Sequence, residues 1–416
     1  VPLFCFPDAL EYKPVKNMKS ETYSFVLTNF DGGRVFGYCK RIQPCDSTLP
    51  EVICIISPVD AINMYNVLLN EIEMRRQISM EIAKELLAAS FGRPLPKPGK
   101  DVQIRCLDEL GEMETVHLHR PSDARLDNVN YDCLLVYLGT DRLIKVFSAL
   151  LLERRVILYS KSLSVLTQVI HAVVALLYPF HWQHIYIPIL PSSMLDVCCA
   201  PTPYLIGILT SHLNTVLDLP LEEVMIVDLD RKNILRSVGD ESTILPKKIT
   251  KALKTAINMC KIDAAERSQT LMISEAFLRV FVETIGHYGE FITTQQDGRK
   301  SFLKENFISK IESQGLQQFL EWFTETQMFE VFITNHLEKQ DWGSVGKIQY
   351  ICFYSVYLFK NRVTSFCLFK NRVTSFCLFK NRVTSFCLFK NRVTSFCLFK
   401  NRVTSICLFK NRVPSF

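Results

Sequence analysis

Between residues 131 and 229, short apolar runs alternate with stretches of helical periodicity, and this alternation limits the fold more than any other feature of the sequence. The helical stretches are residues 140–153 and 163–178. Strands separated by helices are typical of layered α/β domains, and runs that are apolar throughout indicate a sheet buried on both faces. We therefore expect a central α/β layer here. The four runs predicted to be strands are Val156–Tyr159, His184–Ile189, Tyr204–Leu209 and Val224–Leu229.

Residues 1–119 are predicted to form a smaller α/β unit ahead of this layer. Polar and apolar residues alternate from Thr22 to Thr28, which is typical of a strand with one buried face. Asp31-Gly32-Gly33 supplies turn residues that favour a hairpin over residues 22–42. The further elements expected in this unit are a strand at Glu51–Ile56, a helix ending near Arg76, and strands at about Val102–Cys106 and Met113–Leu118.

Residues 245–340 show helical periodicity throughout and predict an all-helical third unit, with an aromatic-rich helix pair from Phe319 to Phe332. The patterns together favour an α/β protein built from a small α/β lobe, a larger α/β lobe and a helical lobe. The boundaries predicted for the units are 1–119, 120–245, 246–345 and, for a C-terminal tail, 346–416.

The tail repeats Leu-Phe-Lys-Asn-Arg-Val-Thr-Ser-Phe-Cys with a period of ten over residues 358–416, and only Ile406 and Pro414 break the pattern. In a helix each copy would turn the apolar face by about 80°, so strands with turns at Lys-Asn-Arg fit better. Near-identity of the copies favours a recently expanded DNA repeat, and we assign the tail no fold and expect it to be disordered or an artefact. A genuine β-stack and a basic tail for membrane surfaces are the alternatives.

The net charge of +6 belongs to this tail, whose six Lys and six Arg are accompanied by no acidic residue. The first 357 residues hold 36 basic and 42 acidic side chains, so the body of the protein is mildly acidic. A nucleic-acid-binding protein needs a basic surface for phosphate contacts. We therefore expect no nucleic-acid partner.

The cysteines do not suggest a disulfide framework. Five of the fifteen belong to the repeats, most of the other ten lie in apolar runs, and no CxxC pair occurs. Free thiols that act as small core residues in a reducing cytosol are the expectation, with no metal site. No signal peptide is visible, and the apolar runs are interrupted before the roughly 20 residues of a membrane span. The first residue is Val1 rather than Met, which favours a fragment.

Motifs for covalent chemistry are missing from the sequence. It has no GxGxxG, no GxxxxGK[ST], no GxSxG and no HExxH. His117, His119, His181 and His184 have no further ligands placed near them by the sequence, and a structural role is expected for all four. The charged run Glu153-Arg154-Arg155 at a helix end is expected to be a solvated cap, with partner binding as the alternative.

Several long blocks resemble the DENN module in the order of its upstream, central and downstream parts. The resemblance covers residues 1 to about 340 and is closest to the second subfamily of DENN-domain-containing proteins. The start is truncated relative to the family, and the tail has no counterpart there. The blocks are VPLFCFPDA at Val1–Ala9, FVLTNFDGGRVFGY at Phe25–Tyr38, LLERRVILY at Leu151–Tyr159, LYPFHWQH at Leu177–His184, IPILPSSMLDVCCAPTPYLIGIL at Ile187–Leu209, VFVETIGHYGE at Val280–Glu290 and FLEWFTETQMFEVF at Phe319–Phe332.

The resemblance implies a bilobed fold, with a longin-like upstream lobe and a three-layer α/β central lobe, followed by a helical lobe. Such proteins bind a Rab-type small GTPase across the cleft between lobes and promote GDP release. This implies an exchange catalyst without covalent chemistry or cofactor, and not a hydrolase or transferase. The family resemblance also implies a cytoplasmic protein that reaches endosomal or Golgi membranes through its Rab.

Candidate Rab contacts are polar or aromatic residues at turns and element ends that would face such a cleft. A turn-forming or packing role is the alternative for each of them. The candidates are Asp31 and Arg34 in the hairpin turn, Arg154 and Arg155 after the first central helix, and Thr202 and Tyr204 before the third central strand.

Two other functions remain open from the sequence. One is a Rab-binding scaffold without exchange activity, and the other is a hydrolase or transferase with a diffuse active site. The sequence does not indicate which Rab is bound or what the oligomeric state is.

Overall fold

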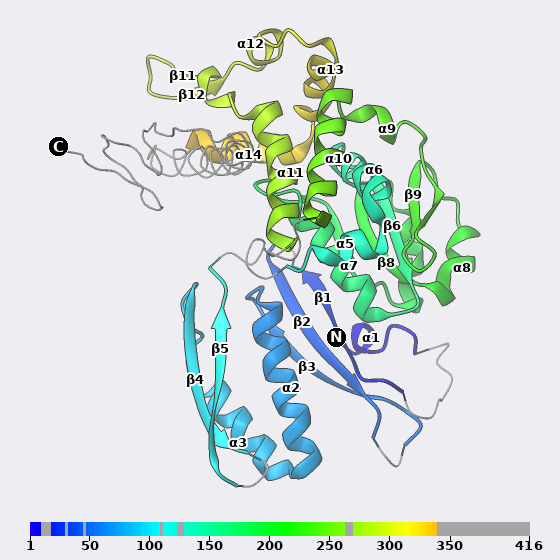
Figure 1. The fold of residues 1–416 in the computed structure, drawn as a ribbon, viewed down its shortest axis with the longest axis vertical. Coiled ribbons are helices and arrows are strands. Elements are labelled where there is room, and N and C mark those ends of the chain that lie inside the picture. Colours follow the sequence, from blue (N-terminus) through cyan, green and yellow to red (C-terminus); the bar gives the residue numbers. More distant parts are fainter. Residues whose placement is uncertain are drawn as a thin grey trace, which may run out of the picture. The chain divides into compact units, whose positions relative to one another are not determined.

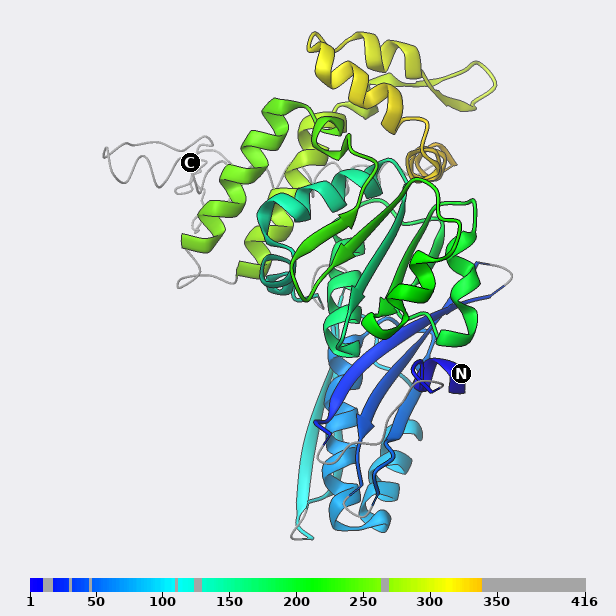
Figure 2. The same ribbon diagram turned by 90° about the vertical axis from the view of Figure 1, so that its right-hand side faces the viewer.

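The structure is a computed structural model that describes residues 1–9, 18–29, 32–44, 47–108, 111–122, 129–262 and 269–338 (Figures 1 and 2). It confirms the predicted mixed α/β fold. The repeat tail lies outside the described residues, so its disorder or artefactual origin stays a prediction, as do the four unit boundaries. Among the described residues no helix combines the length and apolar character that crossing a bilayer requires.

An antiparallel three-stranded sheet in the order β1-β2-β3 confirms the predicted hairpin and third strand. Thr28 of β1 faces Arg34 of β2 across the turn. The prediction of one buried face is wrong, because four successive residues, Tyr23 to Val26, are buried. Both faces of β1 are therefore covered. The bounds are α1 Pro2–Cys5, β1 Glu21–Thr28, β2 Arg34–Ile42 and β3 Glu51–Ser57.

One face of this sheet packs against a second group of elements, around a core that includes Tyr38, Tyr65 and Leu69. Buried Arg75 joins the group: its Nε donates to the carbonyl of Leu107 at 2.9 Å, and its guanidinium pairs with Glu71 and Glu114. The helix and two strands predicted for this region are confirmed. The bounds are α2 Ile62–Ile78, α3 Met80–Phe91, β4 Lys100–Leu107 and β5 Met113–Arg120, with β4 and β5 paired antiparallel.

The central layer is a five-stranded sheet in the order β10-β9-β6-β8-β7, and it confirms the predicted alternation of strands and helices. Strands β7, β8, β6 and β9 are parallel, and β10 is an antiparallel edge. Alternate residues of β6 enter two different cores: Val156 and Leu158 one, Ile157 and Tyr159 the other. The strands are β6 Arg155–Ser160, β7 Ile185–Ile187, β8 Tyr204–Leu209, β9 Val224–Asp228 and β10 Asn233–Arg236.

Helices accompany both faces of the central sheet. The larger core takes side chains from α5, α6 and α7, and the smaller one takes them from the 3-10 helix η1 and from α8. This two-sided burial is why the strands are apolar throughout. The bounds are α5 Asp132–Tyr137, α6 Gly139–Leu151, α7 Leu163–Ala175, η1 Ser192–Cys199, η2 Thr210–His212, α8 Leu213–Leu217 and α9 Glu241–Ile244.

The C-terminal part is mostly helical, but the prediction of helices throughout is wrong. Strands β11 and β12 form a short hairpin whose turn contains Gly298 at φ +86°. The predicted aromatic helix pair is confirmed: Phe323 and Phe329 lie 5.7 Å apart between ring centroids and pack with Phe180 and Phe281. The bounds are α10 Lys247–Ile262, α11 Gln269–Ile285, η4 Tyr288–Phe291, β11 Ile292–Thr294, β12 Lys300–Phe302, α12 Lys304–Ser309, α13 Gln314–Phe323 and α14 Gln327–Glu338.

A glycine in β8 tests the packing of the central layer. A Cβ on Gly207 would lie 2.1 Å from the carbonyl oxygen of Pro188 and 2.6 Å from Ile170 Cδ1. Gly207→Ala is therefore expected to lower the free energy of unfolding by about 1–3 kcal/mol, measured by urea unfolding. The control is Gly315→Ala in α13, where a Cβ meets no heavy atom within 4 Å and stability should hold or rise. Equal effects of the two changes would contradict the close packing.

Candidate functional site

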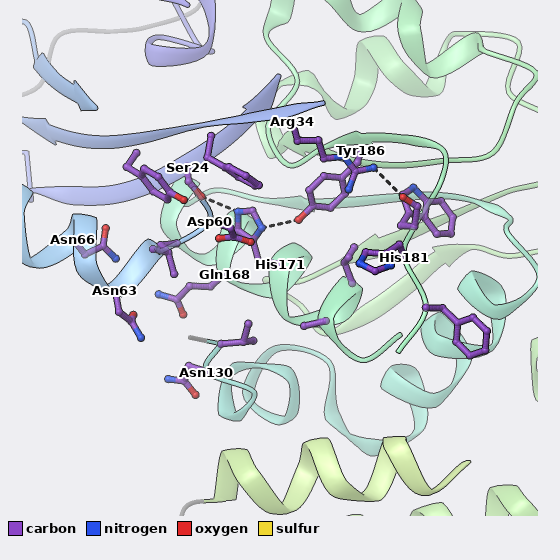
Figure 3. Close-up of a pocket in the computed structure, with 18 residues that line it drawn as sticks. Ser24, Arg34, Asp60, Asn63, Asn66, Asn130, Gln168, His171, His181 and Tyr186 are labelled. Carbon is purple, nitrogen blue, oxygen red and sulfur yellow. Dashed lines mark hydrogen bonds between the residues drawn. The ribbon is translucent and has the colours of Figure 1, made fainter. Parts of the chain in front are cut away.

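A cavity of about 430 Å³ lies between α2 and α7, over the face of the first sheet that carries Arg34 and Tyr38 (Figure 3). Period-two alternation along β2 brings Arg34, Phe36 and Tyr38 to this one face, and Ser24 joins them from β1. The cavity is thus built where the first sheet meets the central layer. It combines extensive apolar walls with converging polar groups from several elements, which makes it the candidate binding site.

Three side chains from distant parts of the chain form a hydrogen-bonded row along the cavity wall (Figure 3). His171 Nε2 lies 2.7 Å from Ser24 Oγ, and His171 Nδ1 lies 2.6 Å from the Tyr186 hydroxyl. Burial lowers the pKa of His171 to about 4, so the ring is neutral near pH 7. A neutral imidazole donates from one nitrogen and accepts at the other, and the two hydroxyls match that requirement.

The row of Ser24, His171 and Tyr186 connects the first sheet to the central layer. A histidine that activates a serine is usually oriented by a carboxylate on its second nitrogen, whereas His171 has a tyrosine hydroxyl there. Ser24 is only 1% exposed, which leaves its Oγ little access to a substrate. The arrangement therefore suits a positioning role: it fixes β1 against α7 and β7.

A second contact between the same elements lies at the start of α7. Glu21 Oε2 accepts hydrogen bonds from the Ser164 amide and the Ser162 hydroxyl, both at 2.7 Å. Ser162 Oγ in turn accepts from the amide of Val165 at 3.3 Å. A carboxylate beside the first amides of a helix satisfies unpaired donors and is favoured by the helix dipole. Both Glu21 and Ser24 thus fasten β1 to α7.

Arg34 lies at the wall of the cavity and contacts the central layer. Its Nη2 donates to the carbonyl of Trp182 at 2.9 Å, and its guanidinium carbon lies 5.3 Å from the centroid of the Tyr186 ring. Burial lowers the pKa of Arg34 from its ordinary value, although the group stays charged. The structure thus brings this candidate residue to the cavity.

The polar side chains of the cavity lining include four amides, exposed His181 and the exposed carboxylate of Asp60, and its buried part is mainly apolar. Side-chain amides on α2 and α7 and before α5 can both donate and accept hydrogen bonds. Such a lining suits an apolar anchor side chain flanked by main-chain groups better than it suits a phosphate. The amides belong to Asn63, Asn66, Asn130 and Gln168, and the apolar lining includes Phe36, Val129, Val174, Ala175, Phe180 and Trp182.

The other candidate residues do not gather at this cavity. Arg154 forms a two-pronged ion pair with Asp240. Arg155 is half-buried at the start of β6, Thr202 is exposed, and neither lines the cavity. Asp31 lies outside the described residues.

The prediction that Tyr204 contacts a partner is wrong. The side chain is fully buried in the smaller central core, and its hydroxyl donates to the carbonyl of Cys198 at 2.8 Å. A residue at the start of a strand covered on both faces has no surface to offer.

The prediction of a solvated helix cap at residues 153–155 is also wrong. The Glu153 side chain is 9% exposed; its carboxylate accepts from the amide of Met328 at 2.6 Å and lies 2.5 Å from His184 Nε2. It therefore fastens the start of α14 to the central layer, and His184 is structural as expected. Of the other predicted structural histidines, His119 is exposed beside Asp101, while His181 lines the cavity.

The lowered pKa of half-buried His171 makes stability depend on pH. Between about pH 4 and 6.5 the unfolded chain binds a proton that the folded chain does not, so the free energy of unfolding rises with pH across this window. The contribution is fully present above about pH 6.5. His171→Gln is expected to remove up to about 1.4 kcal/mol per pH unit of this slope, measured by urea unfolding at a series of pH values.

Ser24→Ala is the matched control, because it removes a hydrogen bond to the ring but keeps the titrating group. This variant should lower the free energy of unfolding by about 1 kcal/mol at each pH and keep the same dependence of that free energy on pH. A slope that His171→Gln leaves intact would contradict the burial of a neutral ring.

Comparisons with known proteins agree with this architecture. The model of the uDENN domain matches residues 1–42, that of the DENN (AEX-3) domain matches residues 48–232, and that of the dDENN domain matches residues 302–347. Human DENN domain-containing protein 2B is 42% identical over 345 residues, which is 80% of this chain and 30% of that protein.

Two further relatives match at similar identity. Human DENN domain-containing protein 2A is 42% identical over 358 residues, or 82% of this chain and 36% of that protein. DENN domain-containing protein 2D of Mus musculus is 39% identical over 339 residues, or 80% of this chain and 72% of that protein. The chain thus spans about a third of the length of the first two relatives.

Proposed function

The chain belongs to the DENN domain family, and from that membership we propose that it is a guanine-nucleotide exchange factor that promotes GDP release from a Rab-type small GTPase. The first sheet would correspond to the longin-like lobe and the five-stranded sheet to the central lobe of the bilobed fold that the resemblance implies. The main support for this proposal is the cavity at the junction of the two sheets. The family resemblance implies that the Rab-binding cleft lies there.

The proposed partner would place an apolar side chain of its surface into the cavity. Asn63, Asn66 and Gln168 would hydrogen-bond the main chain on either side of that anchor, and Arg34 would lie at the wall near Tyr186. Apolar anchors in pockets surrounded by polar groups dominate the energetics of many protein interfaces. The amide-rich mouth supports a protein segment as the occupant.

Exchange by this route needs no covalent step. If the chain binds the nucleotide-free GTPase more tightly than the GDP form by some factor, linkage requires that GDP binding be weakened by the same factor. A difference of about 5.5 kcal/mol corresponds to a factor of about 10⁴. The fixed contacts between β1 and α7 would support this by holding the two walls of the cavity in place without rearrangement.

A Rab-binding scaffold with the same fold is the second candidate. It would use the same cavity and bind the GDP-loaded and nucleotide-free GTPase equally, so that no GDP would be released. In either case the protein would act at endosomal or Golgi membranes through its Rab and contribute to vesicle traffic.

The test is release of fluorescently labelled GDP from a panel of Rab proteins by the full chain. GDP release from at least one Rab is expected to be faster in the presence of the chain. The double variant Asn63→Ala with Gln168→Ala removes two amides from the cavity mouth and is expected to lower kcat/KM for exchange at least tenfold, which is about 1.4 kcal/mol.

A matched double variant, Asn258→Ala with Gln318→Ala, removes the same side-chain types from exposed positions on α10 and α13 and should stay within twofold of the unmodified chain. Binding of a Rab without faster GDP release would reject the exchange function and support the scaffold function. If no Rab binds, both the exchange function and the scaffold function are rejected. If the two double variants lose exchange activity equally, the interface does not lie at the cavity.

A further inference from the structure

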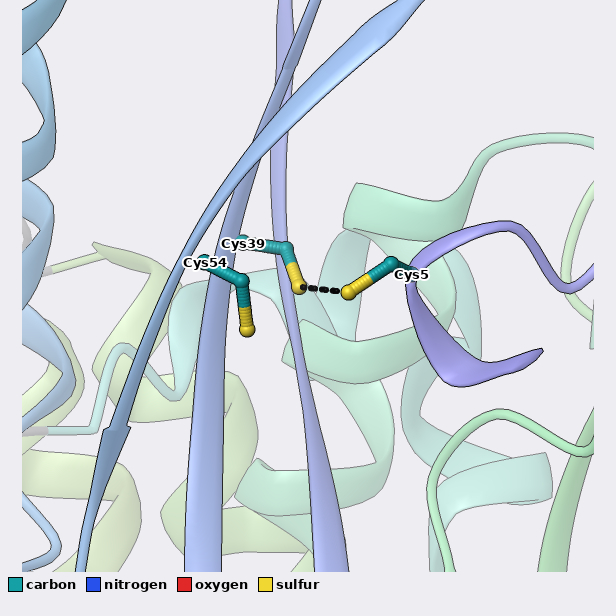
Figure 4. Close-up of side chains that lie close together, drawn as sticks. All are labelled: Cys5, Cys39 and Cys54. Atoms are coloured by element: carbon teal, nitrogen blue, oxygen red, sulfur yellow. Dashed lines mark hydrogen bonds between the residues drawn. The ribbon is translucent and has the colours of Figure 1, made fainter. Parts of the chain in front are cut away.

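Three cysteine thiols that are far apart in the sequence converge beside the first sheet (Figure 4). Because Cys39 follows Tyr38, which lines the cavity, strand alternation places the thiols on the face opposite the cavity. All three sulfurs lie within 4.8 Å of one another, and the sulfurs of Cys5 and Cys39 are 3.9 Å apart. Cys5 and Cys39 are 7% and 0% exposed, and Cys54 is half-buried.

The backbone explains why the thiols meet. Cys39 on β2 and Cys54 on β3 are directly opposite in the antiparallel register, so their side chains share one face of the sheet. Cys5 ends α1, which covers that face. Its carbonyl accepts a hydrogen bond from the Tyr23 hydroxyl at 2.5 Å, which fixes its position above the strands. The ring of Phe4 stacks on Phe25 at 5.2 Å and holds the same helix.

We propose that Cys5, Cys39 and Cys54 form a three-thiolate binding site for one thiophilic d¹⁰ metal ion. Metal–sulfur bonds of about 2.3 Å place two sulfur ligands about 3.8–4.0 Å apart in tetrahedral or trigonal geometry. The Cys5–Cys39 separation of 3.9 Å already meets that requirement. The remaining distances, at most 4.8 Å, need only a change of side-chain rotamer or a small contraction.

A disulfide fits the same distances less well. Its sulfurs lie about 2.05 Å apart, so Cys5 and Cys39 would have to approach by almost 2 Å within a closely packed core. A metal ion would bridge them near their present separation. The sequence-based expectation that these cysteines only fill the core does not explain why three of them gather at one point.

Cu(I) and Zn(II) share the thiolate chemistry that this site offers. Zinc in structural sites takes four ligands, whereas the described residues place three candidate ligands here and no fourth His, Cys, Asp or Glu. The buried sulfurs of Cys5 and Cys39 also leave little room for a water ligand. Three-coordinate Cu(I) is therefore the better fit of the two.

A bound ion would connect α1 to two strands of the first sheet. The N-terminal segment would then be cross-linked to β2 and β3 on the face opposite the cavity, and binding would stabilise the folded state by linkage. This inference does not depend on the proposed exchange activity, since the site and the cavity lie on opposite faces of the sheet.

The experiment uses the full chain with the five repeat cysteines, Cys367, Cys377, Cys387, Cys397 and Cys407, replaced by Ser in every sample. Cu(I) is titrated under anaerobic conditions against a chromophoric Cu(I) chelator, and Zn(II) in a separate arm against a chromophoric zinc chelator. One equivalent per chain is expected, with at least tenfold tighter retention of Cu(I) than in the Cys54→Ser variant and a rise in the melting temperature on loading.

Cys199→Ser is the matched control, because Cys199 is an exposed thiol outside the cluster and its loss should leave the metal affinity unchanged. Cys54 is the least buried of the three, so its variant is expected to fold; Cys5→Ser provides a second variant, and circular dichroism checks both. Stoichiometric binding of Zn(II) instead of Cu(I) would support the site and reverse the choice of ion. No stoichiometric binding in either arm, or equal affinity in Cys54→Ser and Cys199→Ser, would overturn the proposal.

Discussion

The contact between β1 and α7 joins the first sheet to the central layer and forms one side of the cavity. Helix α7 packs against the central strands β6 and β8 and also against β1, so the two sheets share one helix. Glu21 and Ser24 supply polar bonds to both ends of this contact, at the first turn of α7 and at His171. The cavity exists because α2 covers the remaining part of the same sheet face and leaves a gap beside α7.

This contact gives the proposed exchange mechanism its physical basis. A surface that must favour one conformation of a GTPase over another gains most when its own geometry is already fixed, since no ordering free energy is then spent on binding. The neutral His171 between two hydroxyls provides that rigidity without placing a charge in a buried position. On the opposite face of β1, the N-terminal segment buries Tyr23 and Phe25, so the strand is held from both sides.

Much of the fold could be predicted from the sequence, because apolar runs and turn residues act locally. The all-helical prediction for residues 245–340 failed at β11 and β12, since strands of three residues are too short to show a period. Helix α7 did carry a usable signal: Ser164, Gln168 and His171 recur at i, i+4 and i+7, so the helix has one polar stripe on an otherwise apolar surface.

The site was less predictable than the fold, because its contacts join residues far apart in the chain. Arg34 was found from its position at a hairpin turn, whereas Ser24 and His171 are 147 residues apart and neither belongs to a motif. Tyr204 was chosen for its type and position, but the two-sided burial of β8 removes it from the surface. The three clustered cysteines come from one helix and two strands, and only the strand register brings them together.

Hydrogen exchange of the full chain, measured by mass spectrometry with and without a nucleotide-free Rab, shows whether a Rab binds at the cavity. We predict new amide protection in β2 from Arg34 to Tyr38, at the start of α2 and in residues 180–182, which together border the cavity. Residues of α13 and the hairpin β11–β12 should exchange as before. Protection confined to those C-terminal elements, or no change at the cavity in a complex shown to form, would contradict binding of the Rab at the cavity.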